Sequence, residues 1–190
     1  MIYITIFIAA VFVNNIVLSQ FLGICPFLGV SKKIETSLGM AGAVAFVLTL
    51  STIVTWIIQY YLLEPLNLQF LQTITFILVI AGLVQLVEIV LKKLSPALYQ
   101  ALGVFLPLIT TNCAILGVAI LVVQKEFNLM ESTVFAFSTA IGFGLALVLF
   151  AGLREHTNYM KIPKAMQGMP IALVMAGLLA LAFMGFSGIV

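Results

Sequence analysis

Six long apolar segments joined by short polar connections constrain the fold of this chain more than any other feature. They run from Ile2 to Val30, Ser37 to Leu63, Phe70 to Leu91, Ala97 to Val123, Thr133 to Leu153 and Ile171 to Val190. Each is long enough to cross a bilayer, which takes about 20 apolar residues. Only 7% of the residues are charged, against about 25% in an ordinary soluble domain. The sequence therefore predicts an all-α membrane protein with six transmembrane helices, forming a single membrane domain over residues 1–190.

The basic residues are distributed unequally between the connections. Seven of the eight follow the first, third and fifth segments: Lys32, Lys33, Lys92, Lys93, Arg154, Lys161 and Lys164. Only Lys125 falls on the opposite side. Since cytoplasmic loops of membrane proteins carry an excess of Lys and Arg, these three connections are expected in the cytoplasm and both termini outside. No basic residue precedes the first segment, so it is expected to remain as a spanning helix rather than a cleaved signal peptide.

A short repeat surrounds the only two cysteines. The chain reads Cys-Pro-Phe-Leu-Gly-Val from Cys25 and Cys-Ala-Ile-Leu-Gly-Val from Cys113, so both copies fit Cys-x-x-Leu-Gly-Val. Three segments separate the copies, and an odd number of crossings reverses the direction of the chain. The sequence thus predicts two inverted three-helix repeats, over residues 1–95 and 96–190, related by an axis in the membrane plane.

The two cysteine segments also carry residues that interrupt helices. As a straight helix, Ile2 to Val30 would reach about 43 Å, beyond a hydrocarbon core of about 30 Å. Gly23, Pro26 and Gly29 are the candidate breakers in this segment, and Pro107 followed by Thr110-Thr111-Asn112 plays that part before Cys113. Segments 1 and 4 are therefore expected to be broken near Cys25 and Cys113, although a tilted helix would also absorb part of the excess length.

The two cysteines admit three interpretations. They can be small buried hydrophobic residues, a disulfide pair if their Cβ atoms come close enough, or soft thiolate ligands of iron. Iron–sulfur clusters usually take four cysteines, so the third interpretation predicts half a site, completed by a second subunit or a second copy of this chain.

Around both cysteines the sequence resembles a known family. Asn-Asn-Ile-Val-Leu-Ser-Gln-Phe-Leu-Gly-Ile-Cys-Pro-Phe-Leu-Gly-Val-Ser-Lys-Lys, from Asn14, and Leu-Pro-Leu-Ile-Thr-Thr-Asn-Cys-Ala-Ile-Leu-Gly-Val, from Leu106, carry the resemblance. It is to the membrane proteins found as the A subunit of the Rnf complex and, similarly, as the E subunit of the sodium-pumping NADH:quinone oxidoreductase. The likeness covers nearly the whole chain.

This resemblance implies a multi-pass subunit of a prokaryotic cytoplasmic membrane, with no catalytic site of its own. It implies a 2Fe-2S cluster shared with a paralogous E subunit of opposite topology, with Cys25 and Cys113 as this chain's iron ligands. Electrons would pass between a cytoplasmic iron–sulfur subunit and a flavin subunit on the outer side, in a complex that also holds a membrane flavin subunit. The full complex would couple ferredoxin:NAD+ electron transfer to translocation of sodium ions or protons.

Other residues favour an electron carrier over a self-contained transporter. Ion-coupled carriers usually hold an ionisable residue inside the bundle, whereas the carboxylates here fall near segment ends, Glu88 being the deepest. An inverted-repeat transporter or exporter and a structural scaffold remain the alternatives. No nucleotide-binding loop, hydrolase triad or zinc motif occurs, and no basic stripe suggests nucleic acid.

Two groups of residues have open roles. The amide side chains near the cysteines either orient the cysteine turns or satisfy hydrogen bonds between helices; they are Asn14, Asn15, Gln20 and Asn112. Ala136, Ala140 and Gly144 form a small-residue face in the fifth segment, which permits close helix approach either within the chain or against a partner.

Overall fold

The computed structural model describes residues 2–31, 33–66, 68–94, 106–157, 159–160, 163 and 166–188, and these contain helices and no strand. The predicted all-α class is confirmed. The elements are α1 (Ile2–Ile8) with the π-helix η1 (Ala9–Val13), α2 (Ile24–Val30), α3 (Ile34–Ile58) with the π-helix η2 (Gln59–Leu63), the 3-10 turn η3 (Gln69–Leu71) with α4 (Gln72–Leu94), α6 (Leu106–Thr110), α7 (Cys113–Gln124), α8 (Leu129–Thr157), and α9 (Met169–Met184) with the 3-10 turn η5 (Gly185–Gly188). The predicted start of segment four at Ala97 and the basic residues Lys32, Lys161 and Lys164 lie outside the described residues.

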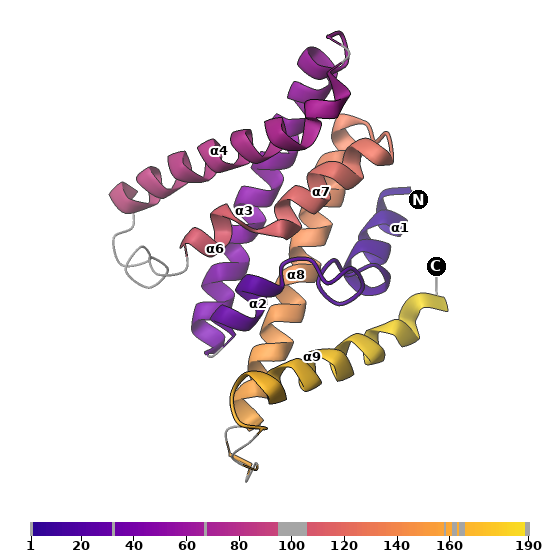
Figure 1. The fold of residues 1–190 in the computed structure, drawn as a ribbon. Helices are drawn as coiled ribbons and strands as arrows, with labels where there is room; N and C mark the ends of the chain where they lie inside the picture. The colour runs from indigo at the N-terminus through magenta and orange to yellow at the C-terminus, as the bar shows by residue number, and fades with distance from the viewer. Residues whose placement is uncertain are drawn as a thin grey trace.

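Helices α3 and α8 pack along each other and form the centre of the molecule (Figure 1). Ala136 and Ala140 of α8 are buried, and a Cβ added at Gly144 would lie 3.1 Å from the Cβ of Ala41 on α3. The small-residue face of α8 therefore serves close packing within the chain. On the same helix, the ring of Phe150 stacks on Phe27 of α2 at 4.3 Å between centroids, which ties the short helix α2 to this core.

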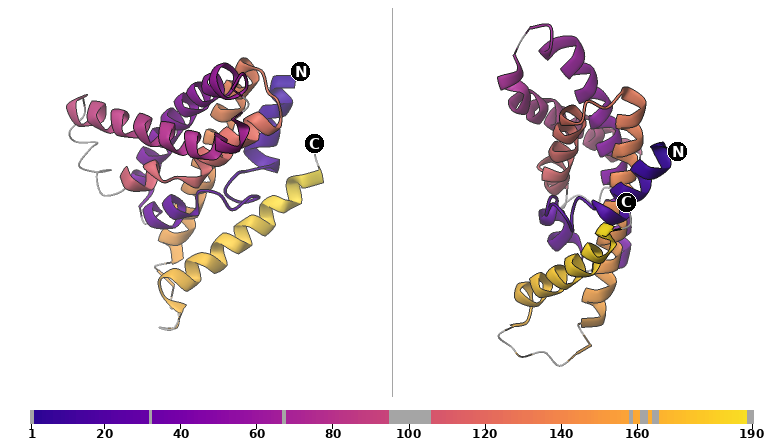
Figure 2. Two further views of the ribbon diagram at one scale, coloured as in Figure 1. Left: turned by 45° about the horizontal axis from the view of Figure 1, so that its top comes forward. Right: turned by 90° about the vertical axis from the view of Figure 1, so that its right-hand side faces the viewer.

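The remaining helices surround this pair. Helix α4 contacts α3 and α7, and α9 contacts α8. Large apolar side chains of α4 and α9 point outward, among them Leu78 at 71% exposed and Leu181 at 65% exposed, as is normal for a surface that meets lipid. The start of α1 and the end of α9 lie near each other in the views of Figure 2, and the rings of Phe12 and Phe186 are 6.2 Å apart.

Four helices are long and apolar enough to cross a membrane among the described residues: Ile34–Leu63, Gln69–Val90, Pro107–Gln124 and Leu129–Thr157. Two shorter apolar helices, Tyr3–Val13 and Met169–Met184, accompany them. This pattern confirms that the chain holds several helices that are long and apolar enough to span a membrane. The count of six spans, the inverted repeats and the side on which the termini lie remain predictions.

Segments 1 and 4 are interrupted just before their cysteines, but three of the expected breakers, Pro26, Gly29 and Pro107, lie inside helices. The first segment leaves the helix after Val13 and resumes at Ile24. Pro26 falls in the first turn of α2 and Gly29 lies inside it, so the expectation that they break the helix was wrong. A proline in the first helical turn costs no hydrogen bond, because the N–H groups there have no partner within the helix.

Candidate functional site

The first interruption is a loop from Asn14 to Gly23, here called the linking loop, which runs between η1 and α2. Asn15 fixes it: its buried side-chain amide donates to the carbonyl of Gly142 on α8 at 2.7 Å and to that of Val11 at 3.2 Å. Its side-chain oxygen accepts the backbone N–H of Val17 at 3.1 Å. One side chain thus pairs with two backbone groups of the segment that unwinds, at Val11 and Val17, and also bonds the loop to α8.

The loop ends in a tight turn that only glycine fits well. Gly23 has φ +78°, and a Cβ there would lie 2.9 Å from a ring carbon of Phe143 on α8 and 3.2 Å from the Cβ of Ala114 on α7. Both the left-handed backbone and the lack of space disfavour any other residue. Two residues earlier, Phe21 also has a left-handed φ, of 56°, which is uncommon for a residue with a side chain.

This turn places a backbone donor on the second cysteine. The N–H of Gly23 donates to the sulfur of Cys113 at 2.9 Å. Cys113 begins α7, and Asn112 caps that helix by accepting the N–H of Ala114 at 3.0 Å. The structure thus brings Gly23, two residues before Cys25, into direct contact with the sulfur of Cys113, so the two cysteine turns lie side by side.

The two thiols differ in accessibility. Cys25 lies in the first turn of α2 and is exposed, whereas Cys113 is half-buried, and both are free. The disulfide interpretation is not what the structure shows. Within the described residues no group of three or more His, Cys, Asp or Glu side chains comes together to hold a metal. The chain therefore offers a pair of thiols, one of them facing outward.

Each repeated motif contributes a glycine that receives a leucine of the other interrupted segment. A Cβ at Gly117 would lie 2.5 Å from a methyl carbon of Leu22, and one at Gly29 would lie 3.2 Å from a methyl carbon of Leu108. The absence of a side chain at these glycines lets the linking loop lie against α7 and α2 against α6. The glycine of each motif thus has a packing role.

Arg154 holds the far end of α2. Its guanidinium donates to the carbonyl of Leu28 at 2.8 Å and to the hydroxyl of Ser31 at 3.1 Å. Both acceptors lie at the C-terminal end of α2, where carbonyls lack helical partners and a positive charge is favourable. The short helix that carries Cys25 is thus bonded to α8 at one end and follows the Gly23 turn at the other.

Sequence reasoning identified the two cysteines and Gly23, and left Asn15 and Asn112 with two possible roles. The structure gives Asn112 the helix cap and Asn15 the loop anchor. It also adds Gly142, Phe143 and Arg154, which were not expected to contribute. Their only signal is position, since all three fall on the one face of α8 that meets the first interrupted segment.

The fold and site together define a class: a helical membrane protein in which two interrupted apolar segments meet at a pair of free cysteines. The chain belongs to the family described as "Rnf-Nqr subunit, membrane protein", whose model matches residues 3–190. The resemblance expected from the two cysteine motifs is confirmed.

Several relatives are similar along nearly their whole length. The A subunit of the Na(+)-translocating ferredoxin:NAD(+) oxidoreductase complex of Acetobacterium woodii is 61% identical over 96% of this chain and 95% of its own. The A subunit of the ion-translocating oxidoreductase complex of Syntrophotalea carbinolica is 60% identical, over 97% and 96%. The protein of the same description in Sodalis glossinidius is 54% identical, over 99% and 97%.

Proposed function

We propose that this chain is the A subunit of an ion-translocating ferredoxin:NAD+ oxidoreductase complex and carries electrons through the membrane as part of it. The descriptions of the relatives support the complex, and the joined cysteine turns support the electron path. The Gly23 N–H on the sulfur of Cys113 is the observation that carries the proposal. It makes the two repeated motifs parts of one polar site among apolar helices.

The donor set fits half of a 2Fe-2S cluster. Such clusters take four protein ligands, usually thiolates, and this chain supplies two free thiols, Cys25 and Cys113. A bound cluster would supply one-electron redox chemistry. Hydrogen bonds from backbone N–H groups to ligating sulfurs stabilise negative charge and tune such sites, and Gly23 already provides one to Cys113.

The exposed side of the site calls for a protein partner. Ser19, Phe21 and Cys25 are all exposed along the linking loop and its exit. Irregular backbone at membrane depth is tolerated where protein or a water-filled cavity covers it, and not against lipid. We therefore propose that the paralogous E subunit covers this face and contributes the other two thiolates. The remaining subunits, which are the cytoplasmic iron–sulfur protein, the outer flavin protein and the membrane flavin protein, would exchange electrons with the pair from either side.

The proposed topology has six spans in two inverted repeats, 1–95 and 96–190, with both termini outside. The paired interruptions before Cys25 and Cys113 support the repeats, as does the reciprocal packing of Leu22 and Leu108 on the motif glycines. With both halves entering the site from opposite sides, the cysteines would lie inside the bilayer. The proposed coupling ion is sodium or a proton.

The cysteines are tested by replacing each with serine in the whole complex. Cys25→Ser and Cys113→Ser complexes are purified, and their iron content and the electron paramagnetic resonance of the dithionite-reduced protein are compared with the parent. We expect each variant to lose the same cluster's iron and signal, because both thiolates would bind one cluster. Thr133→Ser serves as control, since that hydroxyl bonds only to the carbonyl of Leu129 in its own helix.

Unchanged iron and an unchanged spectrum, in variant complexes that still contain the chain, would refute the cluster. The cysteines would then be packing residues. Transport by the chain on its own, without iron, would in that case favour the inverted-repeat transporter, and unchanged activity of both variant complexes would favour the scaffold.

A further inference from the structure

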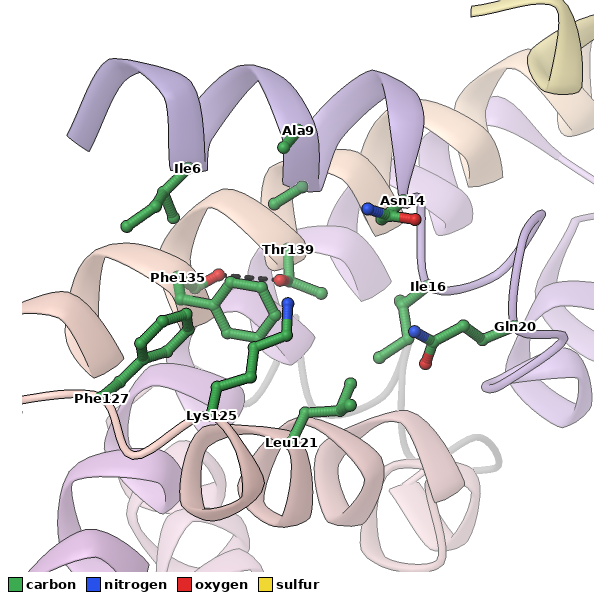
Figure 3. Close-up of a pocket in the computed structure, with 11 residues that line it drawn as sticks. Ile6, Ala9, Asn14, Ile16, Gln20, Leu121, Lys125, Phe127, Phe135 and Thr139 are labelled. Carbon is green, nitrogen blue, oxygen red and sulfur yellow. Dashed lines mark hydrogen bonds between the residues drawn. The ribbon is translucent and has the colours of Figure 1, made fainter. Parts of the chain in front are cut away.

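A second polar site lies beside the linking loop, next to the C-terminal end of α7. A cavity of about 180 Å³ lies between α1 and η1, the linking loop from Asn14 to Gln20, the end of α7 with the connection that follows it, and the first three turns of α8. Figure 3 shows these elements around it, with Lys125 reaching into the middle. This volume has room for several waters or a small polar group.

Lys125 gives the cavity its charge. Its ammonium group lies 5.3 Å from the ring centroid of Phe135 and 5.7 Å from that of Phe127, an arrangement in which the ring faces attract the cation. No carboxylate lines the cavity, and no ion pair of Lys125 occurs in the described part of the chain. The neighbouring Glu131 accepts the N–H of Asn128 instead, at 3.1 Å. The positive charge is therefore oriented without being neutralised.

Two amide side chains face the same cavity from the linking loop. Asn14 and Gln20 both line it, and Figure 3 shows their amide groups on the side opposite the phenylalanine rings. Within the described residues neither side chain has a hydrogen-bond partner. Thr139, which also lines the cavity, bonds to the carbonyl of Phe135 at 2.7 Å. One ammonium and two amide NH2 groups are thus left as donors around one space.

We propose that this cavity binds a phosphate group. A lysine acts as a point charge for phosphate oxygens, and amide NH2 groups supply further donors to the same oxygens. The phenylalanine rings hold the lysine in place from behind. The proposal rests on the side chains of Lys125, Asn14 and Gln20 and does not depend on the role of the two thiols.

The phosphate has two possible sources with the same chemistry. In the proposed topology the cavity lies on the outer side of the membrane, where phospholipid head groups are at hand, and an inorganic phosphate ion is the alternative. Lys125 is the single basic residue on that side of the proposed topology, so a lipid anchored here would be held at one defined place on the outer rim of the protein.

The test uses the purified complex in a neutral maltoside detergent. Native mass spectrometry measures retained phosphatidylglycerol, and thermal unfolding at constant ionic strength measures binding of inorganic phosphate. Lys125→Gln should weaken whichever binding the parent shows by about tenfold or more, since a hydrogen bond to a charged group is lost. Lys125→Arg, which keeps the charge, should retain it. Lys93→Gln, which removes an exposed lysine at the end of α4, is the matched control.

Gln20→Leu gives a second, milder variant that keeps the lysine. It should weaken binding by about tenfold, as expected for the loss of one hydrogen bond to an anionic oxygen while the positive charge of Lys125 remains. A loss confined to phosphatidylglycerol identifies a lipid head group, and a loss confined to inorganic phosphate identifies the free ion. If the parent binds neither, or if the parent, Lys125→Gln and Gln20→Leu bind equally well, the proposal is overturned.

Discussion

At the scale of single residues, adding one methyl group at Gly23 should have a large effect on stability and on the cysteine site. Gly23→Ala forces a side chain into a left-handed conformation, at a cost of about 1 to 2 kcal/mol, and against Phe143, where overpacking adds about 1 to 3 kcal/mol. It would also displace the donor that bonds to Cys113. We expect a lower thermal midpoint of the purified complex and a loss of iron.

Gly42→Ala is the matched control for that substitution. Gly42 lies within α3, and a Cβ there would meet nothing within 4 Å, so alanine should change stability by no more than about 1 kcal/mol, in the favourable direction. If Gly23→Ala behaved like Gly42→Ala in both stability and iron content, the tight packing of the turn would not matter to the site.

The residue-scale features that could be predicted were those with a local pattern. The repeated Cys-x-x-Leu-Gly-Val marked both cysteines, and Gly23 and the Thr-Thr-Asn run before Cys113 marked the interruptions. The hydrogen bond from Asn15 to the carbonyl of Gly142 joins residues 127 positions apart. Its acceptor is a backbone atom, so the residue types at its two ends do not predict it. The close packing of Gly23 against Phe143 was equally hard to predict, because it arises only where the linking loop, α7 and α8 come together.

At the scale of elements, α2 depends on its attachment to α8. It has seven residues, and isolated helices shorter than about 12 residues are marginal. Stacking of Phe27 on Phe150 and the hydrogen bonds from Arg154 provide the stabilisation that so short a helix lacks on its own. The position of Cys25 is therefore set by a helix whose stability comes from its neighbours.

Arg154→Gln should loosen α2 without unfolding the protein. Removing a charged donor from the carbonyl of Leu28 costs about 1.5 to 3 kcal/mol, so the amides of α2 should exchange with deuterium about tenfold faster or more. Hydrogen exchange followed by mass spectrometry measures this. His156→Gln, at an exposed position in the last turn of the same helix, should leave the exchange of α2 unchanged, and equal exchange in both variants would contradict the role given to Arg154.

The element boundaries were predictable only in part, for a physical reason. Apolar content places a segment in the membrane but does not say where its backbone unwinds. Pro26 looked like the breaker, yet a proline is tolerated in the first turn of a helix. The break instead lies earlier, over the linking loop, where Asn15 can replace the missing backbone bonds. Residue type alone could not distinguish a break at Pro26 from a break in the loop before it, because a proline lies beside the break in both cases.

At the scale of the whole molecule, the proposed topology makes a direct prediction about the C-terminus. Because Lys and Arg concentrate in three alternate connections, the positive-inside rule puts both ends outside. Alkaline phosphatase fused after Val190 should be active in cells. Green fluorescent protein fused at the same position should not fluoresce, because it would be exported unfolded. The reverse pair of results would place the end in the cytoplasm and contradict six spans with this orientation.

The same fusions after Lys93 serve as the internal control for expression. That site lies in a connection proposed to be cytoplasmic, so the fluorescent protein should be bright and the phosphatase inactive.

The whole-molecule class was the most predictable feature, since hydrophobicity over 64% of the residues leaves few alternatives to a helical membrane protein. The convergence of α2, α6 and α7 on one site was not derivable from hydrophobicity, because it depends on side-chain packing.

The tryptophan near the end of α3 has a practical consequence. Trp56 is the single tryptophan of the chain; its indole N–H donates to the carbonyl of Phe127 at 2.9 Å, and its ring lies 4.5 Å from that of Tyr60. Phe127 lies in the connection that joins α7, which begins with Cys113, to α8. The fluorescence emission of indole depends on the polarity and hydrogen bonding around the ring. Any motion that separates this connection from α3 would therefore shift the emission wavelength of Trp56. In a complex whose other subunits have had their own tryptophans replaced, the chain would thus carry an unlabelled optical sensor of movement during turnover.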